Sequence, residues 1–252
     1  MSRIDLTTYD THAQSDDAMT ISDEDFNLSL PYAPAGERAA VAAFYALAFE
    51  LRNIPAKVKE APIGEIRLQW WRDALGAAAG GNPPAGHPVL QALARENVLS
   101  AGVMTALDEA MDARAMFLYA DEINSPSALL DHFQRAEAWL TAALLSLSRG
   151  AVSDSVQRGC AMLAGAYAGA RWGRALCERA GGAIAAGDLV AEISARRTEA
   201  KNILNGPVAA DVAGRLVFLS LTDAYARRDD GATFPVVKRL ILFRSMVTGR
   251  LD

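Results

Sequence analysis

Apolar side chains recur every three or four residues over most of the chain, which is the spacing that places them on one face of an α-helix. From Ala35 onward no segment alternates β-branched and polar residues as a half-buried strand would. The pattern therefore predicts an all-α protein. We expect helices over 36–53, 63–79, 88–99, 101–119, 126–149 and 154–180, a broken pair within 183–204, and helices over 207–227 and 235–249.

Proline and glycine separate these helices, as in the loop GGNPPAGHP at 80–88 and the helix start NSPS at 124–127. No linker is long or polar enough to divide the helical part into two domains. Residues 1–24 are polar, rich in acids and without an apolar segment, so they predict a disordered tail rather than a signal or transit peptide. The expected organisation is this acidic tail followed by one helical domain over 25–252.

Hydrophobic residues make up 51% of the sequence, which is enough to bury a sizeable core. No apolar run reaches the roughly 20 residues needed to span a bilayer. The net charge of −5 hides an asymmetry, because residues 1–157 carry 11 basic and 21 acidic side chains whereas residues 158–252 carry 14 and 9. The basic second part suits an anionic ligand or membrane surface, although ordinary solvated helix faces are the preferred explanation. We predict a cytoplasmic protein without a nucleic-acid partner.

Several common catalytic and metal sites are missing from the sequence. The three histidines lie in a tail, a loop and a helix, so they cannot form a metal cage or a catalytic triad. Cys160 and Cys177 lack the spacing of a zinc site and indicate a reducing compartment. Asp108 and Asp112 share one helix face and could hold Mg²⁺, but a lone acidic pair is more typical of a solvated face.

Five segments have a distinctive combination of residues. They are PAGERAAVAAFYALAFELR (34–52), VKEAPIGEIRLQWWRDAL (58–75), the stretch 107–147, LAGAYAGARWGRAL (163–176) and VVKRLILFRSMVTGRL (236–251). Together they resemble the squalene/phytoene synthase family of head-to-head prenyltransferases, and the run EIRLQWWRD is the most specific part. The resemblance implies a single-domain helical bundle with the isoprenoid synthase fold.

Catalytic members of this family carry two aspartates, four residues apart, that bind Mg²⁺ on the substrate diphosphate. The spacing from Tyr45 places these positions at Arg52 and Ala56, which changes the local formal charge by about +3 and repels a divalent cation. A second Asp-rich motif should fall near Arg171 and Arg174, in a segment that is also basic. The resemblance therefore implies a branch without complete Asp-rich motifs, with no catalytic residues, no metal site and no cofactor.

The branch in question is similar to a mitochondrial assembly factor for respiratory complex I. This resemblance implies a non-catalytic protein that assists the assembly of that complex or binds an isoprenoid- or lipid-like ligand. Two alternatives stay open. One is an active Mg²⁺-dependent prenyltransferase for allylic diphosphates, whose metal ligands would be Glu65 or Asp73 with Asp108 and Asp112, and the other is a lipid or quinone carrier. The candidate ligand-binding residues around the former active-site cavity are Tyr45, Arg52, Glu65, Gln69, Arg72, Asp73, Arg171 and Arg174.

Two helical features allow both a structural and a binding interpretation. Trp70 shares a stripe with other apolar residues, which favours a core position over a partner-binding platform; the other members are Ile63, Ile66, Ala74 and Ala77. Arg52, Arg171 and Arg174 suit phosphate oxygens, but we prefer ion pairs across the bundle, for instance with Glu50 or Glu65.

The last helix also has two interpretations. Its apolar residues Val236, Val237, Leu240, Ile241 and Val247 suit burial, and its basic residues Lys238, Arg239, Arg244 and Arg250 occupy the polar positions. A helix that closes the core is the preferred interpretation. The alternative is that residues 235–250 make a peripheral contact with anionic lipid on the inner face of a membrane.

Overall fold

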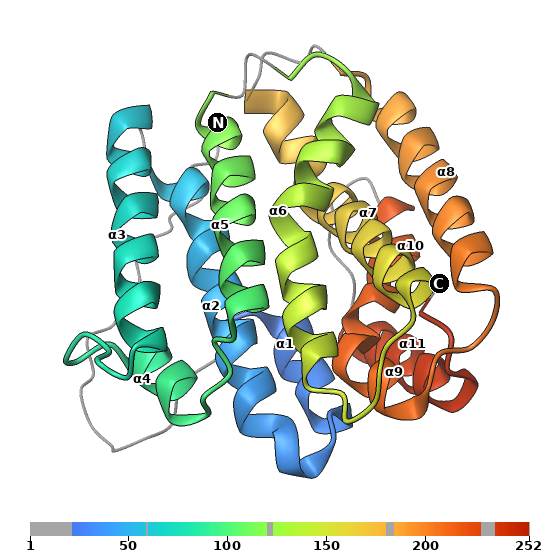
Figure 1. The fold of residues 1–252 in the computed structure, drawn as a ribbon. Helices are drawn as coiled ribbons and strands as arrows, with labels where there is room; N and C mark the ends of the chain where they lie inside the picture. The colour runs from blue at the N-terminus through green and yellow to red at the C-terminus, as the bar shows by residue number, and fades with distance from the viewer. Residues whose placement is uncertain (1–21, 59, 120–122, 180–183, 228–234, 252) are drawn as a thin grey trace.

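The computed structural model describes residues 22–251, except for 59, 120–122, 180–183 and 228–234. All regular secondary structure in these residues is helical, which confirms the predicted fold class (Figure 1). The predicted tail over 1–24 lies outside the described residues up to position 21. Among the described residues, no helix combines the length and the apolar character that crossing a bilayer requires.

The helices follow the predicted order with several changes at their ends. Their bounds are α1 Glu24–Ser29, α2 Arg38–Lys57, α3 Ala61–Ala79, α4 Pro88–Arg95, α5 Ala101–Ala115, α6 Pro126–Ser146, α7 Asp154–Arg179, α8 Ala186–Leu204, α9 Ala210–Leu216, α10 Thr222–Ala226 and α11 Pro235–Thr248. Short 3₁₀ turns lie at η1 Leu30–Tyr32, η2 Ala35–Glu37, η3 Met116–Leu118 and η5 Val217–Leu221.

Several predicted boundaries differ from the structure. Helix α2 does not stop at 53 but continues through Pro55 to Lys57, because a proline in the last turn removes only one helical hydrogen bond. The predicted pair within 183–204 is the single helix α8, and the predicted helix over 207–227 is divided into α9, η5 and α10. Asp23 and Glu24, assigned to the tail, belong to the folded part, since Asp23 caps α1 by accepting from the backbone N–H groups of Asp25 and Phe26.

The helices form one bundle in which α5, α6, α7 and α8 are neighbours in chain order, with α2 beside α6 and α3 on the outside of α2 and α5 (Figure 1). The C-terminal helices α9, α10 and α11 gather at one end of this bundle, together with α1. Helix α1 packs into that end through Phe26, whose ring stacks on Tyr45 with 4.2 Å between centroids. Residues far apart in the sequence therefore meet where α1 closes the bundle.

A stripe of glycines on α7 brings this helix unusually close to α6. A Cβ atom added at Gly165 would lie 2.7 Å from the Cβ and 2.8 Å from the Cα of Gln134, so no larger residue fits without moving the backbone. One turn later, a Cβ atom added at Gly169 would meet the end of the Leu130 side chain. This close approach fixes the position of the α7 side chains that follow the stripe.

Candidate functional site

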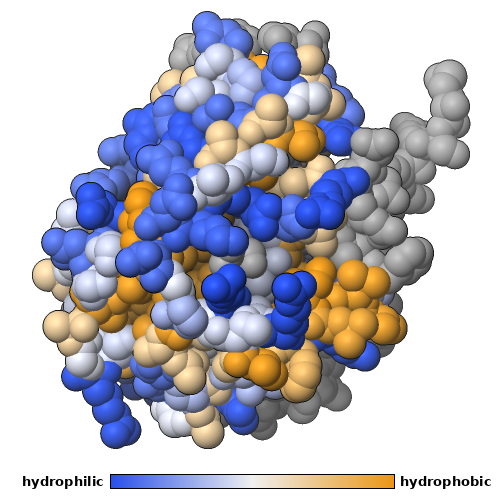
Figure 2. Space-filling view, turned by 90° about the vertical axis from the view of Figure 1, so that its right-hand side faces the viewer, coloured by the Kyte–Doolittle hydropathy of each residue, from blue (hydrophilic) through white to orange (hydrophobic). Residues whose placement is uncertain are grey.

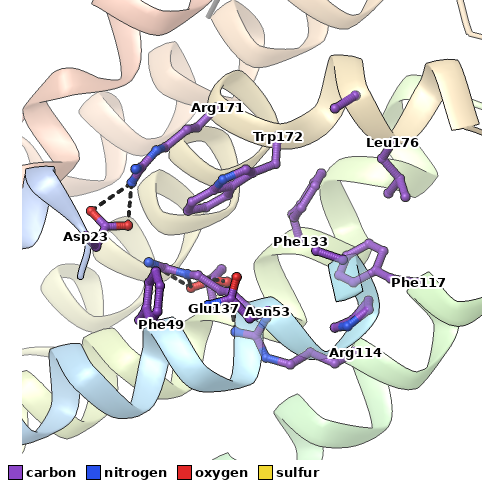
Figure 3. Close-up of a pocket in the computed structure, with 14 residues that line it drawn as sticks. Asp23, Phe49, Asn53, Arg114, Phe117, Phe133, Glu137, Arg171, Trp172 and Leu176 are labelled. Atoms are coloured by element: carbon purple, nitrogen blue, oxygen red, sulfur yellow. Dashed lines mark hydrogen bonds and ion pairs between the residues drawn. The ribbon is translucent and has the colours of Figure 1, made fainter. Parts of the chain in front are cut away.

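A cavity of about 270 Å³ lies between α2, α5, α6 and α7, with Asp23 at the start of α1 on its edge (Figure 3). Its lining mixes charged residues with aromatic and aliphatic ones. The lining residues are Asp23, Phe49, Arg52, Asn53, Pro55, Ala56, Arg114, Phe117, Phe133, Glu137, Arg171, Trp172, Ala175 and Leu176. The continuation of α2 beyond Pro55 matters here, because it keeps Ala56 in helical register below Arg52.

The two opposite helical walls have the same pattern of residues. Helix α2 contributes Arg52 and Ala56, and α7 contributes Arg171 and Ala175, in each case four residues apart. Four residues is about one helical turn, so each arginine and its alanine lie one above the other on the cavity face. The small alanines leave space beside the two guanidinium groups.

Glu137 on α6 binds two arginines from different helices at the bottom of the cavity. The Arg52 Nη2 lies 2.7 Å from Glu137 Oε2, and its Nε lies 3.1 Å from Oε1. From α5, Arg114 Nη2 lies 2.8 Å from Oε1. Burial by itself would raise the pKa of the Glu137 carboxyl, but the two guanidinium groups outweigh it and hold this pKa below its ordinary value. The carboxylate therefore stays ionised and fully engaged.

The partner of Arg52 differs from the expected one. We expected Glu50 or Glu65, but Glu137 lies 85 residues further along the chain and only 3% of its side chain is exposed. Helical spacing shows which residues share a face of one helix, and it contains no information about which helix packs opposite. Neither Glu137 nor Arg114 was predicted from the sequence to be a site residue. The one available signal for Glu137 was that it is an isolated acid on an apolar face of its helix.

Arg171 on α7 is held by acids at the start of α1. Its Nη1 lies 2.8 Å from Asp23 Oδ2 and 3.1 Å from Asp25 Oδ2, and it also donates to the Tyr167 hydroxyl at 2.7 Å. Asp25 is fully buried and accepts from the hydroxyls of Tyr167 and Tyr225 at 2.6 and 2.8 Å. These contacts tie α1 to α7 and α10.

The charge on Asp25 is maintained by its neighbours. Burial alone would raise its pKa, but Arg171, Lys238 and the Tyr167 hydroxyl together hold this pKa below the ordinary value. Burial in turn raises the pKa of Tyr225 to about 12, so the Tyr225 hydroxyl stays protonated and donates its hydrogen bond to Asp25. Lys238 Nζ completes the group at 2.8 Å from Asp25 Oδ1.

Trp172 connects the two charged walls. The Cζ atoms of Arg52 and Arg171 lie 4.7 and 4.8 Å from the centroid of its ring, which is within the range of cation–π contacts. Arg52 Cζ also lies 4.7 Å from the Phe26 centroid. The Arg52 guanidinium is therefore fixed by Glu137 and by two aromatic rings.

Three hydrogen-bond donors on lining residues have no partner among the described residues. They are Arg52 Nη1, Asn53 Nδ2 and Arg114 Nε, and all three atoms are shielded from solvent. Buried donors are nearly always paired in folded proteins, so such atoms next to a cavity suit an acceptor on a ligand. The lining also contains three arginines and two carboxylates, Asp23 and Glu137, which leaves a formal charge of +1.

A family model described as squalene/phytoene synthase matches residues 19–162, which is more than half of the chain. The chain belongs to this family. The matched segment contains α2, α5 and α6, and therefore three of the four helical walls of the cavity. No curated protein and no solved structure matches the chain.

Mg²⁺, which catalytic members of the squalene/phytoene synthase family use, does not fit the groups present in the cavity. Magnesium needs oxygen ligands in an octahedral arrangement. Asp23 and Glu137, the two carboxylates at the cavity, are each bound by an arginine at 2.7–2.8 Å. Across the described residues, no three His, Cys, Asp or Glu side chains are grouped so that they could hold a metal ion.

Only two of the eight sequence candidates, Arg52 and Arg171, line the cavity. Tyr45 is fully buried behind it and donates to the Arg215 carbonyl at 2.7 Å. Arg174 lies on α7 one turn from Arg171 but is not among the lining residues. The remaining four, Glu65, Gln69, Arg72 and Asp73, lie on α3 away from the cavity.

These α3 residues form a separate polar surface with α5. Arg72 binds both Asp108, at 2.7 Å, and Asp112. Gln69 donates to Asp73 at 2.9 Å, and Glu65 accepts from the Tyr119 hydroxyl at 2.9 Å. The set proposed for an unconventional metal site is thus spread over an exposed surface and engaged with other side chains.

The predicted core stripe on α3 is wrong at its large residues. Ile66 and Trp70 have exposed fractions of 70% and 45%, although Ala74 of the same stripe is buried. Leu68 and Trp71, which lie outside the stripe, are buried instead. The helix has apolar residues on more than one face, so the pattern alone could not identify the side that meets the bundle.

Proposed function

We propose that this protein is a non-catalytic member of the squalene/phytoene synthase family. It binds an anionic, isoprenoid- or lipid-like molecule in the cavity and acts in the assembly of respiratory complex I. The observation that carries the binding proposal is Arg52. It stands where we expect the first aspartate of the catalytic members, it lines the cavity, and its Nη1 atom is buried without a hydrogen-bond partner among the described residues. A guanidinium at this position attracts an anion directly, with no need for a bridging cation.

The rest of the cavity supports an amphipathic ligand. Phe117, Phe133 and Leu176 give the lining an apolar side next to the arginines (Figure 3). A volume of about 270 Å³ is at the small end for ligand pockets, so it suits a phosphate or carboxylate head with a short hydrocarbon segment. A longer tail would extend out of the opening.

The ligand proposal is tested by native mass spectrometry of the purified protein, followed by extraction and identification of the bound molecule. We expect one anionic amphiphile per chain. It should be lost from the Arg52→Met and Asn53→Ala variants and retained in Arg72→Met, which removes an arginine far from the cavity. Protein that carries no ligand, or a ligand retained equally in all three variants, would refute the binding proposal.

The assembly proposal is supported by the resemblance to the complex I assembly branch and has its own test. Deletion of the gene should lower the amount and the NADH–quinone activity of complex I, and the wild-type gene should restore both. A deletion strain with normal complex I would exclude the assembly role without affecting the ligand result. Restoration by Arg72→Met but not by Arg52→Met would connect the two roles.

The alternative function is an active Mg²⁺-dependent prenyltransferase. We expect no release of pyrophosphate from farnesyl or geranylgeranyl diphosphate with Mg²⁺, because the cavity carboxylates are engaged by arginines. Release above a protein-free control, and its loss in Glu137→Gln, would favour this alternative over the non-catalytic proposal.

A further inference from the structure

Helix α11 presents its large apolar side chains to solvent. Val236, Leu240, Phe243 and Val247 follow one another at successive turns, and their exposed fractions are 64%, 64%, 60% and 70%. Val237 beside them is 43% exposed. Val236, Val237, Leu240 and Val247 were predicted to face the core, and that prediction is wrong. Figure 2 views the side of the molecule on which the C-terminal helices lie, and it shows apolar surface gathered in patches beside hydrophilic side chains.

The face of α11 that meets the bundle is partly polar. Lys238 and Ser245 are each only 4% exposed, and Leu242 is the large apolar residue fully buried between them. Lys238 Nζ binds Glu24 Oε2 at 2.5 Å and Asp25 Oδ1 at 2.8 Å. Turning the helix to bury Leu240 and Phe243 would break these ion pairs and expose Leu242. The outward orientation of the apolar stripe is therefore fixed by contacts inside the protein.

Basic residues border this stripe on both sides. At about 100° per residue, Arg239 lies on one side of the stripe and Arg244 on the other, and Arg250 follows the end of the helix at Thr248. Arg239, Arg244 and Arg250 are all exposed, and residues 235–251 contain no acidic side chain. A helix with an apolar outer stripe and flanking arginines matches the two layers of an anionic membrane surface, acyl chains below and phosphates above.

We propose that α11 docks this protein on the surface of a bilayer that contains anionic phospholipid. The apolar stripe enters the boundary between headgroups and acyl chains, and Arg239, Arg244 and Arg250 contact the lipid phosphates. The excess of positive charge, with no acid on the same helix, distinguishes this surface from one that would pair with a second copy of itself, because the three arginines of each copy would face each other. The proposal rests on α11 alone and holds whether or not the cavity binds a ligand.

The test is flotation of the full-length protein with two kinds of vesicle. One kind is phosphatidylcholine alone, and the other contains about 30% phosphatidylglycerol, enough to give a negative surface potential. We expect binding to the anionic vesicles only, and a loss of most of it at about 0.5 M salt, where exposed charges are screened. Equal binding to both vesicles, or binding to neither, would overturn the proposal.

Variants identify the surface responsible. The double variant Leu240→Glu, Phe243→Glu should abolish vesicle binding, and Arg239→Gln with Arg244→Gln should weaken it by about 25-fold at low salt, on the scale of about fivefold for each charge. The matched control is Ile66→Glu with Trp70→Glu, which changes the exposed apolar residues of α3 and should leave binding intact. All substituted positions are exposed, so circular dichroism and melting should stay unchanged.

Two results would show that α11 is not the membrane-binding surface. If the α3 variant loses binding and the α11 variant does not, the membrane contact lies on α3. If light scattering shows a dimer that the Leu240→Glu, Phe243→Glu variant dissociates, and the wild type does not float, α11 is a self-association surface instead.

Discussion

Two of the arginine–carboxylate groups that join helices have almost the same contact distances but different surroundings. In the cavity, Arg52 and Arg114 bind Glu137 with contacts of 2.7–2.8 Å. On the surface, Arg72 binds Asp108 at 2.7 Å and also Asp112. The Glu137 side chain is 3% exposed, whereas those of Asp108 and Asp112 are 64% and 76% exposed. The contact distances do not separate the two groups, and burial determines what each contributes.

Because the cavity group is buried, losing one of its members should lower the free energy of unfolding strongly, although the complete group adds little to that free energy. Removing two charges from water costs most of what their attraction returns, so a complete buried group contributes little net free energy. Removing one member, however, leaves its partners charged and without a counter-ion. Water replaces the missing partner in the surface group at little cost.

Replacing Glu137 by alanine should lower the free energy of unfolding by about 3–5 kcal/mol, because two buried guanidinium groups lose their carboxylate. Urea unfolding followed by circular dichroism measures this change. The matched control is Asp112→Ala, which removes a carboxylate that also binds an arginine but lies in solvent. Similar losses in the two variants would show that burial does not separate the groups.

Acid should weaken the buried carboxylates selectively. The folded-state pKa values of Glu137 and Asp25 lie below their ordinary values of 4.5 and 3.8, so their contribution is present above those values and is lost as the pH falls through the lower folded-state ones. We expect the free energy of unfolding to fall steeply in acid. Urea titrations at a series of pH values measure the slope, which Glu137→Gln should reduce. If Glu137→Gln keeps the full wild-type slope, Glu137 does not contribute to the loss of stability in acid.

The position of α7 beside the cavity group should depend on Gly165. Alanine at this site would place its Cβ 2.7–2.8 Å from Gln134, which forces the two helices apart. We expect a loss of about 1–3 kcal/mol in the free energy of unfolding, the usual cost of overpacking. Thermal melts measure it, and Gly102→Ala is the control, because the added methyl group there has open space around it. A gain in stability for Gly165→Ala would mean that the helices can separate freely.

The smallest effect is expected for the surface group. Arg72→Ala should change the free energy of unfolding by about 0–1 kcal/mol, and this change should disappear at high salt, since exposed ion pairs are weak and screened. Chemical unfolding at low and high salt is the measurement. A loss as large as that of Glu137→Ala would place the α3–α5 surface on the same level as the cavity.

The sequence predicted the part of this structure that local patterns determine. Helical spacing predicted an all-α protein, and Arg52, which the family resemblance implied as a cavity residue, lines the cavity. The partner of Arg52 could not be predicted, because Glu137 becomes its neighbour only when α6 packs against α2. The predicted orientations of α3 and α11 were wrong for a related reason, because both helices have apolar residues on two faces. On α11 the buried face also contains Lys238, whose charge is paired with Asp25 from the opposite end of the chain.

The glycine stripe on α7 determines how the cavity can respond to ligands of different size. Where helices meet through long side chains, rotamer changes allow a pocket to widen. At Gly165 and Gly169 the α6–α7 contact has no side chain on the α7 side to rearrange. The α6 and α7 backbones therefore form the fixed part of the cavity, and its size can change only through rotamers of lining side chains such as Phe49, Phe117, Phe133 and Trp172. Alteration of ligand size by mutation would consequently succeed at these side chains and fail at the α7 glycines.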